Sequence, residues 1–205
     1  MPIVTMTWRA LGVAAVAFSL ATTAVLAQQP GRIRGQIEKA DGGVMVLKTR
    51  DGVMLNVKVD EKTRLTALVK ATLADIKPDT FIGIAGVPRP DGSIEAFSIH
   101  IPPAAIRGQG EGVRPWDARP GSSMTNAYFE SAVASTDGHV LTVKNKDGEK
   151  KVIVTNATAI AAAAPADRAE LKPGAQIIIF GSEKQPDGVV LIKSMYVGRG
   201  VTPAM

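Results

Sequence analysis

The side chains best suited to binding chemistry are concentrated in one short segment near the middle of the chain. Arg114, Trp116, Asp117 and Arg119 lie there, interspersed with prolines that stiffen the backbone. Trp and Arg are enriched at the centres of protein interfaces, and a neighbouring carboxylate can pair with an arginine. We therefore predict these four residues as a candidate partner-binding site.

Two arrangements of this segment remain open from its residues alone. In one, Trp116 fills a groove between neighbouring domains, while Arg114 or Arg119 pairs with Asp117 or stacks on the indole. In the other, the same side chains face outward toward a partner. Only the second arrangement makes the segment a recognition surface.

Residues for catalysis or metal binding are scarce. The chain has no cysteine, which excludes disulfides, thiolate metal sites and thiol nucleophiles. Its two histidines, His100 and His139, provide little material for a metal site or a catalytic triad. The Gly-rich run 108–112 lacks the strand and helix that frame a phosphate-binding loop. We predict no catalytic, cofactor-binding or metal-ligating residue, although acidic pairs leave an Asp/Glu hydrolase open.

The charge distribution ranks partner classes. The formal net charge of +5 comes from charges scattered along the chain, a pattern typical of solvated strand faces. Aromatic residues make up only 4% of the chain, too few and too dispersed for a base-stacking platform. We expect no nucleic acid partner, whereas an envelope protein or polymer remains open. The oligomeric state is not determined by composition.

The elements that must position these residues form an internal repeat. Asp-Gly turns and a Lys-Pro step recur at near-constant spacing, so that Gly42 corresponds to Gly138 and Pro78 to Pro173. Apolar residues that we predict to face inward match by type in the two copies. These pairs are Ile33/Phe129, Ile37/Val133, Met45/Leu141, Leu47/Val143, Ile82/Ile177, Ile84/Ile179, Ile94/Val190 and Ile99/Met195.

The element order within a copy predicts the fold. Alternating apolar residues and turn signals predict three strands in the first copy, then a short helix at 68–76 that ends before Pro78, then two more strands. This is the order of an OB-like barrel. We therefore predict a mainly β protein with two tandem five-stranded OB-like barrels, each with one short helix between strands 3 and 4.

The repeat also sets the predicted domain boundaries. The first OB-like β domain spans 32–101, and the second spans 127–198. Between them lies a Gly/Pro/Arg-rich interdomain segment, 102–126, which is long for a passive connector. A loose tail follows at 199–205.

Residues 1–27 have the features of a secretory signal peptide. Arg9 precedes an apolar run at 10–26, and small or branched residues stand before Gln28. We predict export to the periplasm, with no transmembrane span after cleavage. The alternative is that residues 10–26 are not cleaved and anchor the chain in the inner membrane.

The repeated pattern, together with the central run Gly108-Gln109-Gly110-Glu111-Gly112-Val113-Arg114-Pro115-Trp116-Asp117, resembles a family of uncharacterised exported bacterial proteins with OB-like repeats. The resemblance covers almost all of the mature chain and implies the compartment and the fold. Some members of the similar subgroup are labelled metal ABC transporter permeases. This sequence does not support that label, because a permease needs several spanning helices.

These observations predict a non-enzymatic exported protein of the cell envelope that acts in binding or as a scaffold, with the segment around Trp116 as its recognition surface. One alternative is an accessory protein that binds a small ligand or a metal ion for envelope transport. A second alternative is a hydrolase that acts on an envelope polymer.

Overall fold

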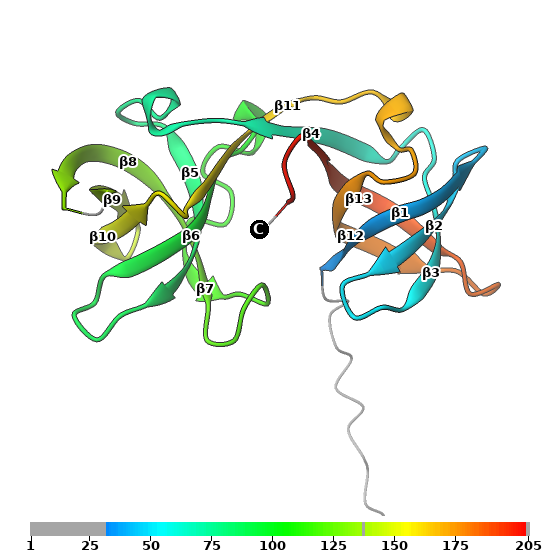
Figure 1. Cartoon of the computed structure of the whole chain (residues 1–205), viewed down its shortest axis with the longest axis horizontal. Helices are drawn as coiled ribbons and strands as arrows, with labels where there is room; N and C mark the ends of the chain where they lie inside the picture. The colour runs from blue at the N-terminus through cyan, green and yellow to red at the C-terminus, as the bar shows by residue number, and fades with distance from the viewer. Residues whose placement is uncertain (1–31, 137, 204–205) are drawn as a thin grey trace, which may run out of the picture.

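The computed structural model describes residues 32–136 and 138–203 and is built almost entirely from β-strands (Figure 1). The predicted signal peptide, 1–27, lies outside the described residues. No helix among the described residues is long and apolar enough to span a membrane.

Each sequence copy contributes six strands and one turn of 3-10 helix. The first copy contains β1 (Ile33–Asp41), β2 (Val44–Thr49), β3 (Met54–Lys58), β4 (Arg64–Lys70), η1 (Leu73–Asp75), β5 (Phe81–Pro88) and β6 (Ile94–Ile101). The second copy contains β8 (Ser123–Ser135), β9 (Gly138–Asn145), β10 (Gly148–Thr155), β11 (Ala159–Pro165), η3 (Arg168–Glu170), β12 (Gln176–Lys184) and β13 (Val190–Arg199). Between the copies lie η2 (Ala104–Ile106) and β7 (Gly112–Pro115).

The strand pairings close a five-stranded barrel in the order β1-β2-β3-β13-β12, which we call the first barrel. The parallel pairing of β3 with β13, at Val57 and Val190, closes one seam. The antiparallel pairing of β12 with β1 closes the other. The prediction of a mainly β protein with a closed five-stranded barrel is therefore confirmed.

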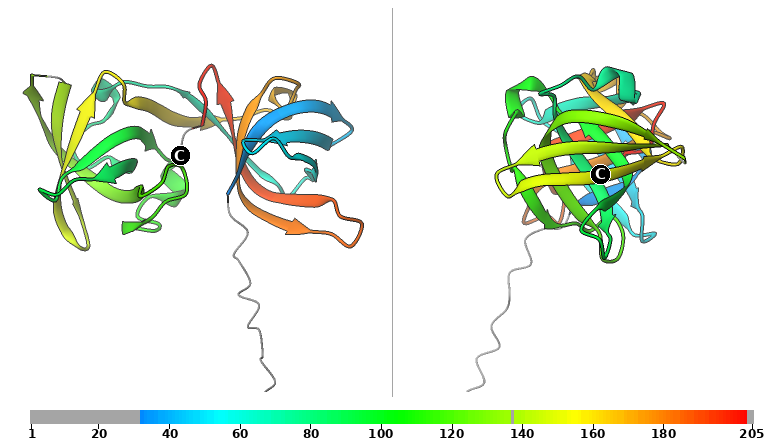
Figure 2. Two further views of the ribbon diagram at one scale, coloured as in Figure 1. Left: turned by 60° about the horizontal axis from the view of Figure 1, so that its bottom comes forward. Right: turned by 90° about the vertical axis from the view of Figure 1, so that its left-hand side faces the viewer.

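The remaining long strands pair in a second ring of five, β8-β9-β10-β6-β5, which we call the second barrel. Here β10 pairs in parallel with β6, and β5 pairs with β8. The two rings are seen as two separate lobes in Figures 1 and 2.

Each barrel takes strands from both sequence copies. The first barrel combines β1–β3 of the first copy with β12 and β13 of the second, and the second barrel combines β5 and β6 with β8–β10. The predicted domains, 32–101 and 127–198, therefore do not close two tandem barrels. The exchange occurs because β4 and β11 run antiparallel between the lobes and carry the chain across (Figure 1).

The predicted helix at 68–76 is also wrong. Residues Arg64–Lys70 form β4, and only Leu73–Asp75 form a turn of 3-10 helix. β4 pairs with β13 on one side and β11 on the other, and Ala67 and Leu68 are both buried. Because consecutive residues are buried in this strand, it lacks the alternation by which a half-buried strand is recognised.

Most of the predicted inward-facing pairs are buried, and they fill the two barrel cores. Val133 is an exception, with 66% of its surface exposed. The register of β8 against β9 shifts between Phe129 and Ser131, and such a bulge reverses the side-chain phase of the residues that follow. Ile33 is only half-buried, at the start of β1.

The predicted loose tail is partly packed. Arg199 belongs to β13 and forms an ion pair with Glu170. Beyond it, Pro203 is buried, and the backbone of Val201 lies so close to Gly198 that no Cβ would fit there. The end of the described chain therefore folds back between the lobes (Figure 1).

Candidate functional site: the cleft between the barrels

The segment between the copies forms a hairpin with the second barrel. β7 pairs with the first four residues of β8, from Gly112 opposite Asn126 to Pro115 opposite Ser123. The hairpin end, 116–122, is closed by hydrogen bonds between Trp116 and Ser122 in both directions. The segment is therefore part of the sheet of the second barrel rather than a free connector.

Trp116 lies in a third apolar cluster that joins the two barrels. The indole is only 7% exposed. The cluster takes Phe97 and Met124 from the second barrel and Phe180 and Tyr196 from the first. This is the arrangement in which Trp116 fills a groove between domains, and it leaves little of the indole for a partner.

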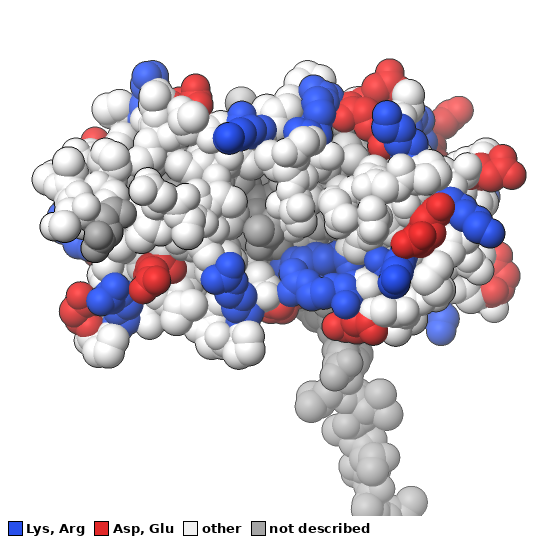
Figure 3. Space-filling view, in the orientation of Figure 1, with Lys and Arg blue, Asp and Glu red and all other residues white. Residues whose placement is uncertain are grey.

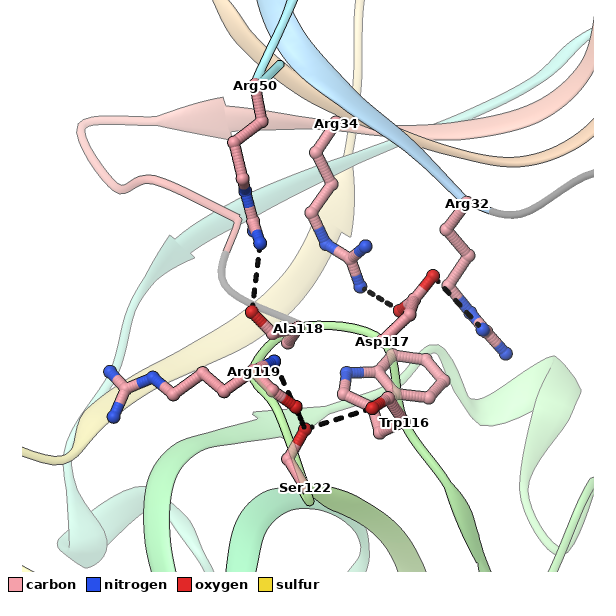
Figure 4. A network of polar contacts seen from close by, with 8 residues as sticks. All are labelled: Arg32, Arg34, Arg50, Trp116, Asp117, Ala118, Arg119 and Ser122. Carbon is pink, nitrogen blue, oxygen red and sulfur yellow. Dashed lines mark hydrogen bonds and ion pairs between the residues drawn. The ribbon is translucent and has the colours of Figure 1, made fainter.

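Arginines of the first barrel hold the end of this hairpin (Figure 4). Arg34 donates a hydrogen bond to Asp117 over 2.8 Å, and Arg32 lies 3.7 Å from the other carboxylate oxygen. The guanidinium of Arg32 also stacks on Trp116, with its carbon 3.7 Å from the ring centroid. Arg50 donates to the carbonyl of Ala118. Asp117 thus pairs with Arg34 of β1 and with Arg32 just before it, and not with Arg114 or Arg119. The predicted stacking on the indole is found for Arg114, whose guanidinium carbon lies 5.7 Å from the Trp116 ring centroid.

A cavity of about 520 Å³ opens between the barrels beside this contact. Its volume falls within the usual range of small-molecule sites. Both barrels, β4 and the η2–β7 segment contribute to its walls. The lining residues are Arg32, Arg64, Thr66, His100, Pro103, Ala105, Ile106, Gln109, Gly110, Arg114, Trp116, Met124, Asn126, Phe180, Ser194 and Tyr196.

The cavity lining is cationic. Three of its residues, Arg32, Arg64 and Arg114, are arginines, and none is acidic. Arg114 donates a hydrogen bond to the carbonyl of Gly110 over 2.8 Å. Neither Arg64 nor Arg114 forms an ion pair with a described carboxylate. Lys and Arg side chains also gather at the junction of the two lobes in Figure 3.

Two of these arginines carry an electrostatic penalty. Burial lowers the pKa of Arg114, and the charge of Arg32 lowers it further. Burial likewise lowers the pKa of Arg32, where the raising effect of Asp117 is opposed by the charge of Arg34. Both shifts mean that the charged guanidinium is less stable there than in water. An anion in the cavity would reverse this destabilisation.

His100 adds a neutral, polar group to the same wall. Burial lowers the pKa of His100 to about 4, helped by the charge of Arg114 and opposed by the backbone of Gly83. The imidazole packs directly on Gly83, where a Cβ would overlap its Cε1 atom. Its Nδ1 is buried without a hydrogen-bond partner, as is Nε1 of Trp116. Asn126, through its Oδ1, is a third lining residue of this kind, and native structures usually avoid such unsatisfied polar atoms.

The cavity lining also includes apolar residues. Phe180 and Tyr196 pack edge to face, with ring centroids 4.9 Å apart, and Ile106 and Met124 add aliphatic surface. Asn126 is fixed by hydrogen bonds from Nδ2 to the carbonyls of Gln109 and Gly110. The lining of the cleft therefore combines arginines with apolar and aromatic residues.

The structure brings together only part of the predicted site. Arg114 and Trp116 line the cavity, and Asp117 lies next to it as the partner of Arg34. Arg119 is exposed and stacks on Phe97, with its guanidinium carbon 4.0 Å from the ring centroid. It does not line the cavity.

Sequence reasoning missed Arg32, Arg64, His100 and Tyr196. A signal existed for the last two. Because Ile99 and Met195 occupy matching inward positions, the next residues, His100 and Tyr196, must both face outward at equivalent points. Nothing in the sequence indicated that these two outward faces meet across a cleft.

Among residues 32–136 and 138–203, no group of three or more His, Asp or Glu side chains is placed to hold a metal ion. In comparisons with protein-family models, curated proteins and solved structures, none matches this chain.

Proposed function

We propose that this protein is a non-enzymatic binding protein that takes a small organic anion in the cavity between its barrels. One observation carries the proposal: three arginines line the cavity and no acidic residue does. Guanidinium groups bind carboxylate, sulfate and phosphate oxygens through charge-assisted hydrogen bonds. A bound anion would therefore be held by Arg32 and Arg114, whose charges disfavour each other when the cavity contains no anion.

The geometry favours a small ligand over a protein partner at this site. Trp116, which the sequence predicted as the centre of a recognition surface, is buried between the barrels. The carboxylate of Asp117 is paired with Arg34. A partner could reach either group only after the interbarrel contact opened. The proposal thus corresponds to the small-ligand alternative drawn from the sequence.

Two further expectations accompany the proposal and stay predictions. Export through residues 1–27 would place the site in the periplasm, where small organic anions are accessible. The OB-like nature of the barrels is supported by the ring order of the first barrel, in which the third strand pairs in parallel with the last.

Calorimetric titration of the chain from Gln28 onward with small anions tests the function. We expect at least one of benzoate, phenyl sulfate, phenyl phosphate and inorganic phosphate to bind with one-to-one stoichiometry. Arg114→Gln should weaken that binding about tenfold or more, since hydrogen bonds to charged groups are the strong ones.

The matched control is Arg89→Gln, which removes an exposed arginine on the β5–β6 hairpin whose one ion pair with a described carboxylate is to Glu95. This variant should bind as the parent does. Equal weakening by both variants would show that the anion responds to net charge and not to the cavity. No binding of any anion at millimolar concentration would contradict the proposed function.

A further inference from the structure

The cavity also indicates which class of anion it takes. We propose that the ligand is an organic phosphate monoester, whose doubly charged phosphate contacts Arg32 and Arg114 and whose organic group packs on the apolar residues that line the cleft. This inference rests on the proposed function and narrows it to one ligand class.

The local charge balance favours a dianion over a monoanion. Three arginines, Arg32, Arg64 and Arg114, line the cavity, and among the described carboxylates only Asp117 forms an ion pair with one of them, Arg32. Asp117 lies closer to Arg34 than to Arg32. A single negative charge would leave most of this excess uncompensated, whereas a phosphate monoester carries about −1.5 to −2 at neutral pH.

The positions of the two proposed phosphate ligands fit this assignment. The guanidinium carbons of Arg32 and Arg114 lie 3.7 Å and 5.7 Å from the centroid of the same Trp116 ring. Arg114 is held by the carbonyl of Gly110 and retains further N–H groups. Both side chains line the same cavity and the charge of Arg32 destabilises that of Arg114, so a phosphate in contact with both guanidiniums would relieve this repulsion.

The rest of the cavity needs more than an inorganic ion. Phe180, Tyr196 and Ile106 line it, are partly exposed, and would face only water around free phosphate. An apolar or aromatic group on the ester would cover this surface and displace that water. The ligand is therefore an ester with an organic group and not phosphate alone.

The surroundings of the site make a clean pH test available. The titratable groups that face the cavity are His100 from β6, Tyr196 from β13, Arg64 from β4, Arg114 from β7, and Arg32 just before β1, with Asp117 beside them. His100 has a pKa of about 4, burial raises the pKa of Tyr196, and the arginines lower the pKa of Asp117. None of these groups changes charge between pH 5 and pH 7.5, whereas a phosphate monoester loses its second proton with a pKa of about 6.

The experiment compares phenyl phosphate with phenyl sulfate, which has nearly the same shape and remains singly charged. Both are titrated calorimetrically into the unmodified chain from Gln28 onward at pH 7.5 and at pH 5. We expect phenyl phosphate to bind about tenfold more tightly at pH 7.5, and this preference to fall to about twofold or less at pH 5. Inorganic phosphate, without the ring, should bind about tenfold more weakly than phenyl phosphate.

Each outcome separates the inference from the function on which it rests. Equal affinity for phenyl sulfate and phenyl phosphate at pH 7.5 would contradict the inference that the ligand is a dianion and would leave the proposed anion binding intact. Equal affinity for phenyl phosphate and inorganic phosphate would contradict the inference that the ligand carries an organic group. Binding of neither class would remove the proposed function itself. Because the comparison uses the parent protein, it does not depend on any variant folding.

Discussion

Arg34 and Asp117 form a direct contact between the two barrels (Figure 4). Arg34 belongs to β1 of the first barrel, and Asp117 lies in the turn of the β7–β8 hairpin of the second. The side chain of Arg34 is 8% exposed, and that of Asp117 is 40% exposed. The contact lies directly beside the Trp116 indole on which Arg32 stacks. The stability of the cleft and the position of its arginines are therefore connected through one carboxylate.

Asp117→Asn should lower the free energy of unfolding by about 1–2 kcal/mol at pH 7, below the value for a fully buried pair because water screens the exposed carboxylate. Burial alone would raise the pKa of Asp117, but the hydrogen bond from Arg34 and the charges of Arg34 and Arg32 lower it overall. A lowered folded-state pKa gives stability above the ordinary value of 3.8 and loses it as pH falls through the folded-state value.

Urea unfolding of both proteins between pH 7 and pH 2.5 measures this difference. It should be constant above about pH 5 and shrink below about pH 4. Glu95→Gln, which breaks the exposed pair with Arg89, serves as the control and should change stability by about 0.5 kcal/mol or less. A difference for Asp117→Asn that grew on acidification would contradict the assigned contact.

Trp116→Ala should destabilise the protein by about 3–5 kcal/mol, because it empties the centre of the cluster that joins the barrels. Trp116→Phe should cost clearly less, since an aromatic ring would still fill part of the space. The other tryptophan, Trp8, lies in the predicted signal peptide. In a chain from Gln28 onward, tryptophan fluorescence therefore follows Trp116 alone, and its urea transition should coincide with that of circular dichroism. A cost under about 1 kcal/mol for the alanine variant would show that the indole is dispensable.

Gly83→Ala should destabilise the protein through His100, whose ring atoms are the three nearest to the new Cβ. The new Cβ would overlap the imidazole and force it out of its place on the cavity wall. In a His100→Ala background, the same substitution should cost little, so that the double-mutant cycle gives a coupling energy of about 1–3 kcal/mol. Gly181→Ala is the control, because its Cβ would lie 3.4 Å from the nearest atom, an ordinary contact. Additive effects of Gly83→Ala and His100→Ala would contradict the packing of the ring on the glycine.

Two fragments divided within the loop at 107–111 should fold only together. Residues 32–108 contain β1–β3 without β12 and β13, and residues 109–205 contain β8–β10 without β5 and β6. We expect neither fragment to form a folded monomer, and an equimolar mixture to form a one-to-one complex by light scattering and circular dichroism. A folded monomer of either fragment would show that a copy can close its own barrel.

The barrel cores were predictable because their residues alternate with a period of two. Pairs such as Ile84 and Ile179 are buried as expected, and the Asp-Gly turns mark the strand ends. The similarity of the two copies made the repeat visible, and the same similarity made the exchange of strands between them unpredictable. Strands with matched apolar residues fit either barrel equally well, so sequence similarity does not determine which strand pairs with β1.

The candidate site was predictable only where its residues lie close together along the chain. Arg114 and Trp116 belong to one unusual segment, whereas Arg32 precedes β1 and Arg64 begins β4, far apart along the chain. Their convergence depends on how the lobes sit against each other, which β4 and β11 determine. Outward-facing positions have no periodic signal that identifies what they meet.

The exchange of strands also sets the order in which the chain becomes able to fold as it is synthesised or exported from its N-terminus. The second barrel has all its strands once Thr155 has emerged, although it begins later in the sequence. The first barrel must wait for β13, which ends at Arg199. The earliest strands, β1–β3, therefore spend the longest time with their apolar faces uncovered. A chain that ends before β12 leaves β1–β3 without the two strands that complete their barrel.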